Sequence, residues 1–199
     1  MRSLPALLAA ISALQFFPKP AQAGVHVEDV DFLYIEPTVG AETLHLRLGS
    51  LDQALRGNLI GDDQTSTSLS LGALAGVRVG FLSVSVLLQR GSHTLGPAGS
   101  QEEAVADKVF GDLGFHARVT KGIAIAPHLS FGFAQLHSAA LPEPLQGLGA
   151  KAGIAIELNP CSAISVGMRA DADIQAYETD AMYSIAYGFT VAGSIGLHL

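Results

Sequence analysis

Residues 183–199 read YSIAYGFTVAGSIGLHL, and this stretch decides the fold class. Its odd-numbered positions carry Tyr, Ile, Phe, Val and Leu with one Gly, whereas its even-numbered positions carry Ser, Ala, Gly, Thr and His. Successive side chains of an extended strand point to opposite faces, so an alternation of period two gives the strand two different faces. The stretch therefore predicts a β-strand with one bulky apolar face and one small, polar face.

The same alternation recurs through most of the preceding chain, interrupted by turn residues such as Gly80-Phe81 and Lys121-Gly122. Together with a less regular first strand, the segments predict an all-β chain of eight strands. After that first strand, the predicted segments are 67–79, 82–88, 107–120, 123–133, 147–158, 164–174 and 183–199.

The first strand has two hydrophobic phases. Leu44, Leu46 and Leu48 alternate with His45 and Arg47, whereas the run over 32–39 follows a different phase. A β-bulge inserts one extra residue and shifts the phase of a strand. We therefore expect one strand with a bulge near Gly40.

The lengths of the connections alternate. Three connections comprise only a few residues, and the connections between them are longer and polar, with many Asp and Glu residues. Short turns at one end and longer loops at the other are typical of up-and-down membrane barrels. The acidic loops are predicted to be either solvated connectors or the surface that binds a ligand. The longer stretches are 49–66, 91–105, 138–146 and 175–182.

The N-terminus has the organisation of a secretory signal peptide. Arg2 precedes an apolar stretch over 4–17, and Ala21-Gln22-Ala23 forms a small-x-small cleavage site. We expect residues 1–23 to be removed and 24–199 to form one domain. No later segment approaches the roughly 20 consecutive apolar residues of a membrane helix.

Composition limits the class of partner. Removal of Arg2 and Lys19 leaves 9 basic residues (11 − 2) and all 18 acidic ones, for a net charge of −9. Nucleic-acid binding requires basic residues that neutralise phosphates, so nucleic acid is excluded as a partner. Cys161 is the only cysteine, which rules out an intrachain disulfide. The mean hydropathy of +0.37 is high for a chain without helix-length apolar runs, and an apolar face distributed over many strands accounts for it.

Alternation alone would also fit a soluble barrel with an apolar interior. Eight strands leave an interior only wide enough for side chains, which favours small residues there. The polar face is mainly Gly, Ala, Ser and Thr, while the apolar face carries no charge on strands two to eight. We therefore predict a transmembrane barrel with its bulky apolar face toward lipid.

In these patterns the mature chain resembles the small outer-membrane β-barrels of the OmpA and OmpX type. The resemblance implies location in the outer membrane of a Gram-negative bacterium and contact with outer-membrane lipid and lipopolysaccharide. It also implies recognition of the last strand by the barrel-assembly machinery. Members usually end in an aromatic residue, whereas this chain ends in Leu199 and has no Trp.

The polar face carries charges of both signs. Buried charges are tolerated when they are paired and hydrogen-bonded, so we predict an ion-pair network that fills and rigidifies the lumen. The alternative is a narrow charged pore, or a gate that opens when the pairs exchange partners. The members are Arg47, Arg78, Asp112, Arg118, Lys151, Glu157, Arg169, Asp171 and Asp173.

Histidines on the polar faces are candidate sites of chemistry. His128-Leu129-Ser130 is similar to the His-x-Ser pair of lipid A deacylases, which are eight-stranded barrels. In this chain the pair is predicted to face the lumen, away from an acyl substrate in the membrane, so no catalytic residue is assigned. His45, His116 and His198 are also predicted to point into the lumen. No metal or cofactor is predicted, because nothing in the spacing shows three or four converging ligands.

The leading hypothesis is a non-enzymatic outer-membrane barrel with a structural role in the envelope or a role in surface interaction. Three alternatives stay open: a narrow pore for small solutes, a hydrolase that uses His128 and Ser130, and a soluble periplasmic barrel that binds an apolar ligand.

Overall fold

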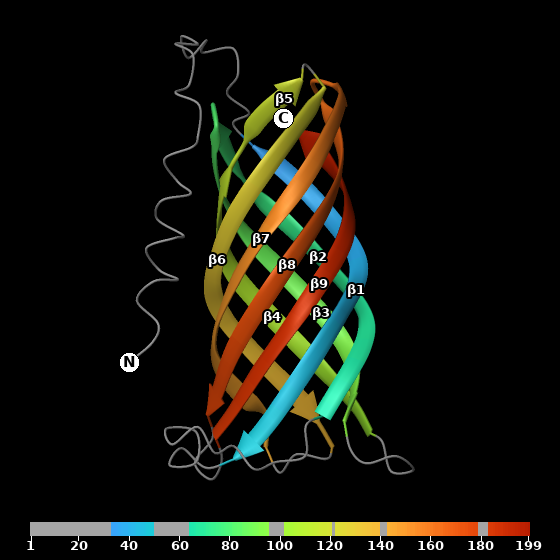
Figure 1. Cartoon of the computed structure of the whole chain (residues 1–199), viewed down its shortest axis with the longest axis vertical. Coiled ribbons are helices and arrows are strands. Elements are labelled where there is room, and N and C mark those ends of the chain that lie inside the picture. The colour runs from blue at the N-terminus through green and yellow to red at the C-terminus, as the bar shows by residue number, and fades with distance from the viewer. Residues whose placement is uncertain (1–32, 50–63, 96–101, 121, 140–142, 179–182) are drawn as a thin grey trace, which may run out of the picture.

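The computed structural model describes residues 33–49, 64–95, 102–120, 122–139, 143–178 and 183–199. These residues form an antiparallel barrel, with no helix among them (Figure 1). None of them forms a helix long and apolar enough to cross a membrane. The predicted signal peptide lies outside the described residues. The strands are β1 (Tyr34–Gly49), β2 (Gln64–Val79), β3 (Leu82–Leu95), β4 (Glu102–Phe115), β5 (Ala117–Thr120), β6 (Ile123–Ser138), β7 (Leu145–Cys161), β8 (Ile164–Glu178) and β9 (Tyr183–His198).

The barrel is closed and has eight strand positions, which confirms the predicted fold class. Neighbouring strands pair in sequence order, β9 pairs with β1, and β4 pairs with β6. The short β5 also pairs with β6 and continues β4 after a break at His116, so β4 and β5 occupy one position. The alternation of short and longer connections is confirmed. Gly80, in the turn between β2 and β3, has a φ of 61°, which a glycine adopts without strain.

The stagger of the barrel can be followed along one row of paired residues. The row starts at Val39 in β1 and passes around all eight strand positions to Gly49, also in β1. The shift is ten residues (49 − 39). For eight strands spaced roughly 4.8 Å apart with a rise of roughly 3.4 Å per residue, such a shift tilts the strands by about 40°. The intermediate residues of the row are Leu71, Arg90, Asp107, Gln135, Gln146, Glu178 and Tyr183.

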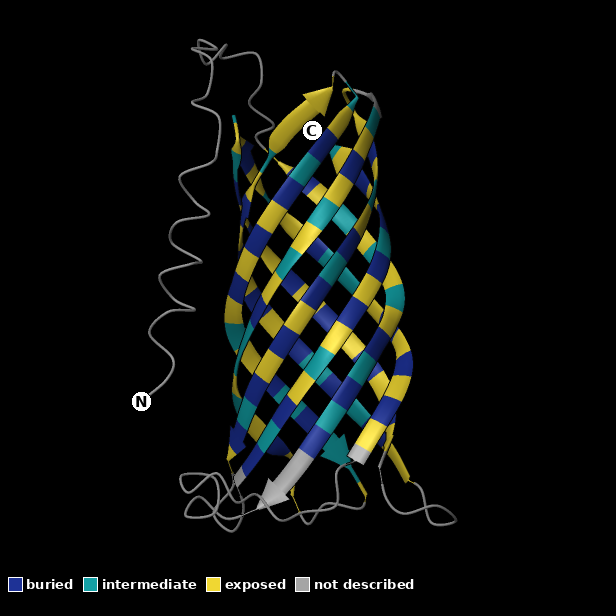
Figure 2. Cartoon of the chain, viewed as in Figure 1, coloured by how far each residue is buried: buried dark blue, intermediate teal, exposed yellow. Residues whose placement is uncertain are grey.

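The outer wall is an apolar belt. Exposed and buried residues alternate along the strands (Figure 2), and the exposed set is the bulky apolar one. Ile154, Val166 and Phe189 are exposed, whereas Asp171 is buried, so the predicted orientation is confirmed. In four strands every outward position of an eleven-residue run is apolar, over 69–79, 123–133, 148–158 and 164–174. A tilted strand needs roughly 9–11 residues to cross a bilayer, so each run matches one crossing.

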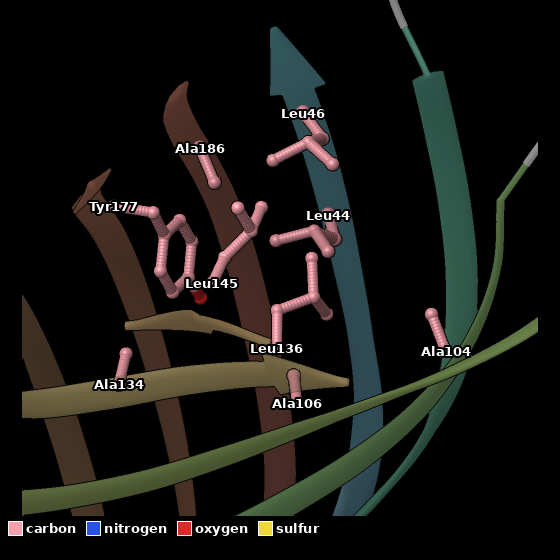
Figure 3. Close-up of a cluster of buried hydrophobic side chains, with 9 residues drawn as sticks. All are labelled: Leu44, Leu46, Ala104, Ala106, Ala134, Leu136, Leu145, Tyr177 and Ala186. Atoms are coloured by element: carbon pink, nitrogen blue, oxygen red, sulfur yellow. The ribbon is translucent and has the colours of Figure 1, made fainter. Parts of the chain in front are cut away.

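At the loop end of the strands the polarity of the two faces reverses, so that the interior is apolar and the outward face is mainly polar. We call this part of the strands the collar. Its interior holds Leu44, Leu46, Leu136, Leu145 and Tyr177 with four alanines, which point toward one another (Figure 3). The collar therefore has the polarity of a soluble barrel, while the belt below it has that of a membrane barrel. The polar outward residues of the collar are Thr43, His45, Thr65, Thr67, Arg90, Ser92, Thr94, Glu103, Asp107, Gln135, His137, Gln146 and Glu178.

The collar explains why the expected bulge near Gly40 is wrong. β1 pairs with β2 in one uniform register from Tyr34 to Leu46. The hydrophobic phase changes because the surroundings of the strand change, not because a residue is inserted. His45 consequently faces outward instead of into the lumen, and its ring stacks on Tyr187 with centroids 4.9 Å apart.

The loops are shorter than predicted, for the same reason. β3 continues to Leu95 and β4 starts at Glu102, so much of the stretch 91–105 is strand. Apart from Val105, the outward residues described there are polar, and the sequence of a water-exposed collar resembles that of a loop.

A charge introduced on the belt should destabilise the barrel. We expect Ile154→Arg, near the middle of the belt, to lower the free energy of unfolding in phosphatidylcholine bilayers by about 2–4 kcal/mol. Gln146→Arg is the matched control, because Gln146 faces outward on the same strand but lies in the collar. Urea titration of the two variants measures the difference. Equal losses would contradict the assignment of the belt.

Candidate functional site in the barrel interior

The interior of the barrel is lined by small residues with charged and polar side chains between them. Glycines make room where long side chains from non-adjacent strands meet. A Cβ atom at Gly153 in β7 would collide with Asp171 and with the Nε2 atom of His128. The absence of a side chain on β7 therefore lets β6 and β8 contact each other across it.

The first interior cluster lies at the turn end of the barrel. Arg78 donates from Nη2 to both carboxylate oxygens of Glu157, at 3.1 Å each. His116 places Nδ1 3.2 Å from Glu157 Oε1, and its Nε2 atom lies 2.8 Å from the Ser83 hydroxyl. The guanidinium of Arg78 also lies over the ring of Tyr34, 5.5 Å from its centroid. Side chains from β1, β2, β3 and β7 are thereby joined at this end.

The second cluster lies further into the interior and is organised by Arg169. Its Nη2 atom donates to Asp112 at 3.2 Å and its Nε atom donates to Asp171 at 3.1 Å. Ser130 donates to Asp112, and His128 Nε2 is hydrogen-bonded to Asp171. Each carboxylate therefore has one cationic partner and one further partner from β6.

The third cluster lies below the collar and is organised by Lys108. Its ammonium donates to Glu42 and, at 2.7 Å, to Asp173. Gln89 donates to Glu42 at 2.8 Å and accepts from Lys151. The side chains of Lys108 and Glu42 have no surface that water can reach. This part of the interior is closed to bulk solvent, and the two ammonium groups of Lys108 and Lys151 face the carboxylates of Glu42 and Asp173.

Of the nine residues predicted for the lumen, seven are buried in the interior: Arg78, Asp112, Lys151, Glu157, Arg169, Asp171 and Asp173. Arg118 does not belong with them, because it lies in β5, whose four residues are all exposed. The break at His116 brings β5 to the rim, where a polar side chain reaches water instead of a closed interior. The backbone of Arg47 belongs to β1, but its side chain lies outside the described residues.

Sequence reasoning missed Glu42, Lys108 and Gln89. Lys108 shares the parity of Asp112 in one strand, so alternation alone could have identified it. Glu42 was missed because the phase of β1 was misread around Gly40. Gln89 lies one residue beyond the last apolar residue counted for its strand, and only the longer β3 reveals that it points inward.

The geometry around His128 and Ser130 differs from that of a hydrolase. Both side chains are buried inside the barrel, as predicted from their parity. A nucleophilic serine is activated by a base within hydrogen-bond reach. Here the Ser130 hydroxyl donates to Asp112, while His128 bonds to Asp171. Within the described residues, no group of three or more His, Cys, Asp or Glu side chains is placed to hold a metal ion.

Comparison with known proteins supports the fold only. No family model and no curated protein sequence matches the chain. The crystal structure of Neisserial surface protein A is similar, with a TM-score of 0.57 and 10% identity, and the match covers 84% of this chain and 97% of that one. The outer membrane protein OprG from Pseudomonas aeruginosa matches with a TM-score of 0.53 and 7% identity, over 86% and 99% of the two chains. The chain therefore has the fold of the small outer-membrane β-barrels.

Removal of one interior cation should destabilise the barrel far more than removal of an exposed one. We expect Arg169→Met to cost about 3–5 kcal/mol, because Asp112 and Asp171 would remain buried without their shared cation. Arg90→Met is the matched control, since Arg90 forms an exposed pair with Asp107, and such pairs contribute little in water. Denaturant unfolding in phosphatidylcholine bilayers provides the measurement. A stable Arg169→Met variant would contradict a stabilising role for the network.

Proposed function

We propose that the protein is a non-enzymatic barrel of the Gram-negative outer membrane, with a closed interior and a role in envelope structure or surface interaction. One observation carries the proposal: an apolar belt one bilayer crossing high surrounds an interior of matched charges. A soluble ligand-binding barrel would have the opposite arrangement along its whole length. Here only the collar has it.

Two observations support the location. The fold is shared with a protein named as an outer membrane protein and with one named as a surface protein. The sequence over 1–23 has the pattern of a signal peptide, whose cleavage stays a prediction. Insertion of the last strand by the barrel-assembly machinery is part of the same proposal, as is contact with outer-membrane lipid and lipopolysaccharide.

The packing of the interior supports a structural role over that of a pore. In the collar, Leu46, Leu136, Leu145 and Tyr177 have no exposed surface, and Leu44 has 1%. Below them the side chains of Lys108 and Lys151 are equally inaccessible to water. An ion would have to displace an apolar cluster and break buried ion pairs in order to pass.

The interior also supports the absence of enzymatic activity. Ser130 and His128 are enclosed by the barrel wall, and the lipid side of that wall at this level presents Leu129 and Phe131. An acyl substrate in the membrane would have no access to either side chain. Any function in recognition is therefore assigned to the loop end, where the acidic connections lie and where a surface ligand would bind.

Fractionation tests the location and the closure of the barrel together. We expect the protein in the outer-membrane fraction, resistant to extraction by high salt or carbonate. It should migrate faster on gels before boiling than after, because a closed barrel stays compact in detergent. Release without detergent would favour the soluble ligand-binding barrel instead.

Recordings in planar lipid bilayers test whether the interior conducts. We expect no stable channel openings from the purified wild-type protein, since the interior is filled at the levels of the collar and of the ion-pair clusters. Reproducible openings in the wild type, absent from a boiled sample, would favour the pore.

A further inference from the structure

One seam between neighbouring strands lacks backbone pairing in the collar. β2 and β3 pair from Val79↔Leu82 to Ser70↔Gly91, and the pairing ends there although both strands continue toward the loop end. Within the described residues, every other seam keeps its backbone pairing into the collar. The pairs nearest the loop end in those seams are Leu46↔Gln64, Leu95↔Glu102, Ala104↔Ser138, Leu136↔Leu145, Gln146↔Glu178, Glu178↔Tyr183 and Gly49↔Tyr183. An unpaired seam is tolerated here because the collar lies outside the hydrocarbon.

Side chains join β2 and β3 where the backbone does not. Thr94 donates from its backbone N–H to the Ser66 hydroxyl at 3.0 Å, and the two hydroxyl oxygens lie 3.5 Å apart. Nε2 of His93 lies 3.4 Å from the Ser68 hydroxyl and 3.9 Å from Oε1 of Glu42. We call the contacts of Ser66 with Thr94 and of Ser68 with His93 the seam latch.

His93 is enclosed, although its ring is only partly hydrogen-bonded. Its side chain has no exposed surface, and its Nδ1 atom is buried without a hydrogen-bond partner. On β4 its register partner is Ala104, which belongs to the apolar cluster of the collar (Figure 3). A protonated ring carries N–H groups on both nitrogens, and the one at Nδ1 would have no acceptor among the described residues. A buried donor without an acceptor costs free energy, so the closed collar favours the neutral ring.

The charges near His93 are balanced only while its ring is neutral. The third cluster contains two ammonium groups and two carboxylates. Protonation of His93 would add a positive charge that has no carboxylate of its own. Burial lowers the pKa of His93 below its ordinary value and outweighs Glu42, which acts in the opposite direction. The ionisable side chains of this part of the interior are Glu42 on β1, Lys108 on β4, Lys151 on β7, and Asp173 and Tyr177 on β8; among the described residues, β2, β6 and β9 present none inward at this level.

We propose that protonation of His93 releases the seam latch, so that the collar opens between β2 and β3 in acid. In the described collar this seam is the one place where a charged ring can reach water without the loss of backbone pairs. The open collar binds the proton more readily than the closed one. The closed collar is therefore fully favoured above about pH 6.5 and loses stability as the pH falls below that value. The inference goes beyond the proposed function, because it makes the loop end responsive to pH.

Amide hydrogen exchange tests the proposal, followed residue by residue by NMR on the full, folded protein in detergent micelles. Rates corrected for the intrinsic pH dependence of exchange measure the opening. Below about pH 6.5, we expect the corrected rate at Thr94 to rise by up to about tenfold for each pH unit. The amide of Phe189 is the matched control, because it donates to the Thr43 hydroxyl at 3.1 Å across a seam with continuous backbone pairing. Its corrected rate should stay constant.

His93→Gln removes the titrating ring but keeps a polar side chain opposite Ser68, so the rate at Thr94 should become independent of pH. His137→Gln is the control variant, since His137 faces outward on β6 and should leave the response intact. The folded state of each preparation is read from its heat-modifiable mobility. If His93→Gln does not fold, the wild type decides: the ring signals of His93 should titrate with the same midpoint as the rate at Thr94.

A corrected rate at Thr94 that stays constant in the wild type would overturn the proposal. An equal rise at Phe189, a response that survives in His93→Gln, or a different midpoint for the His93 ring would overturn it as well. The measurement uses purified protein, so its failure leaves the proposed location unaffected. Equally, a failure of the fractionation experiment would leave this inference unaffected.

Discussion

The structure depends on the requirement that no backbone N–H or C=O group be left unpaired in hydrocarbon. Strands can satisfy it only when their sheet has no edge, and the pairing of β4 with β6 removes the edge that would otherwise face lipid. Closure with eight positions and a shift of ten residues then fixes both tilt and interior width. That width limits the volume of the inward-facing side chains, which is why glycines and alanines line so much of the interior.

The charged interior is a second consequence of closure. Interior side chains have little access to water, so each charge must be matched by the protein. Lys108 lies between Glu42 and Asp173, and Arg169 lies between Asp112 and Asp171. Because each cation joins side chains from different strands, the ion pairs tie distant parts of the wall together.

Much of this arrangement could be predicted from the sequence, and the failures share a physical cause. Alternation identified the belt because lipid and interior impose opposite demands on successive residues. It failed at Leu44 and Leu46, because water replaces lipid outside the barrel at this level. The outward positions there are mainly polar, and the apolar residues point inward. It failed at Arg118 because parity does not reveal where the wall ends. The specific partners, such as Glu42 with Lys108, join residues 66 positions apart in the sequence. No local pattern encodes such a pair without the register of the strands.

The reversal of polarity between belt and collar also sets how deeply the molecule sits. A shift toward the turn end would bring Arg90, Asp107 and Gln135 into acyl chains, and a shift toward the loop end would expose Phe133 and Leu148 to water. At the turn end, by contrast, the wall is apolar as far as Val79, Leu158 and Ile164. The level at which the wall changes from apolar to polar is therefore fixed only at the loop end, and a thicker or thinner bilayer has to adapt at the leaflet around the turn end.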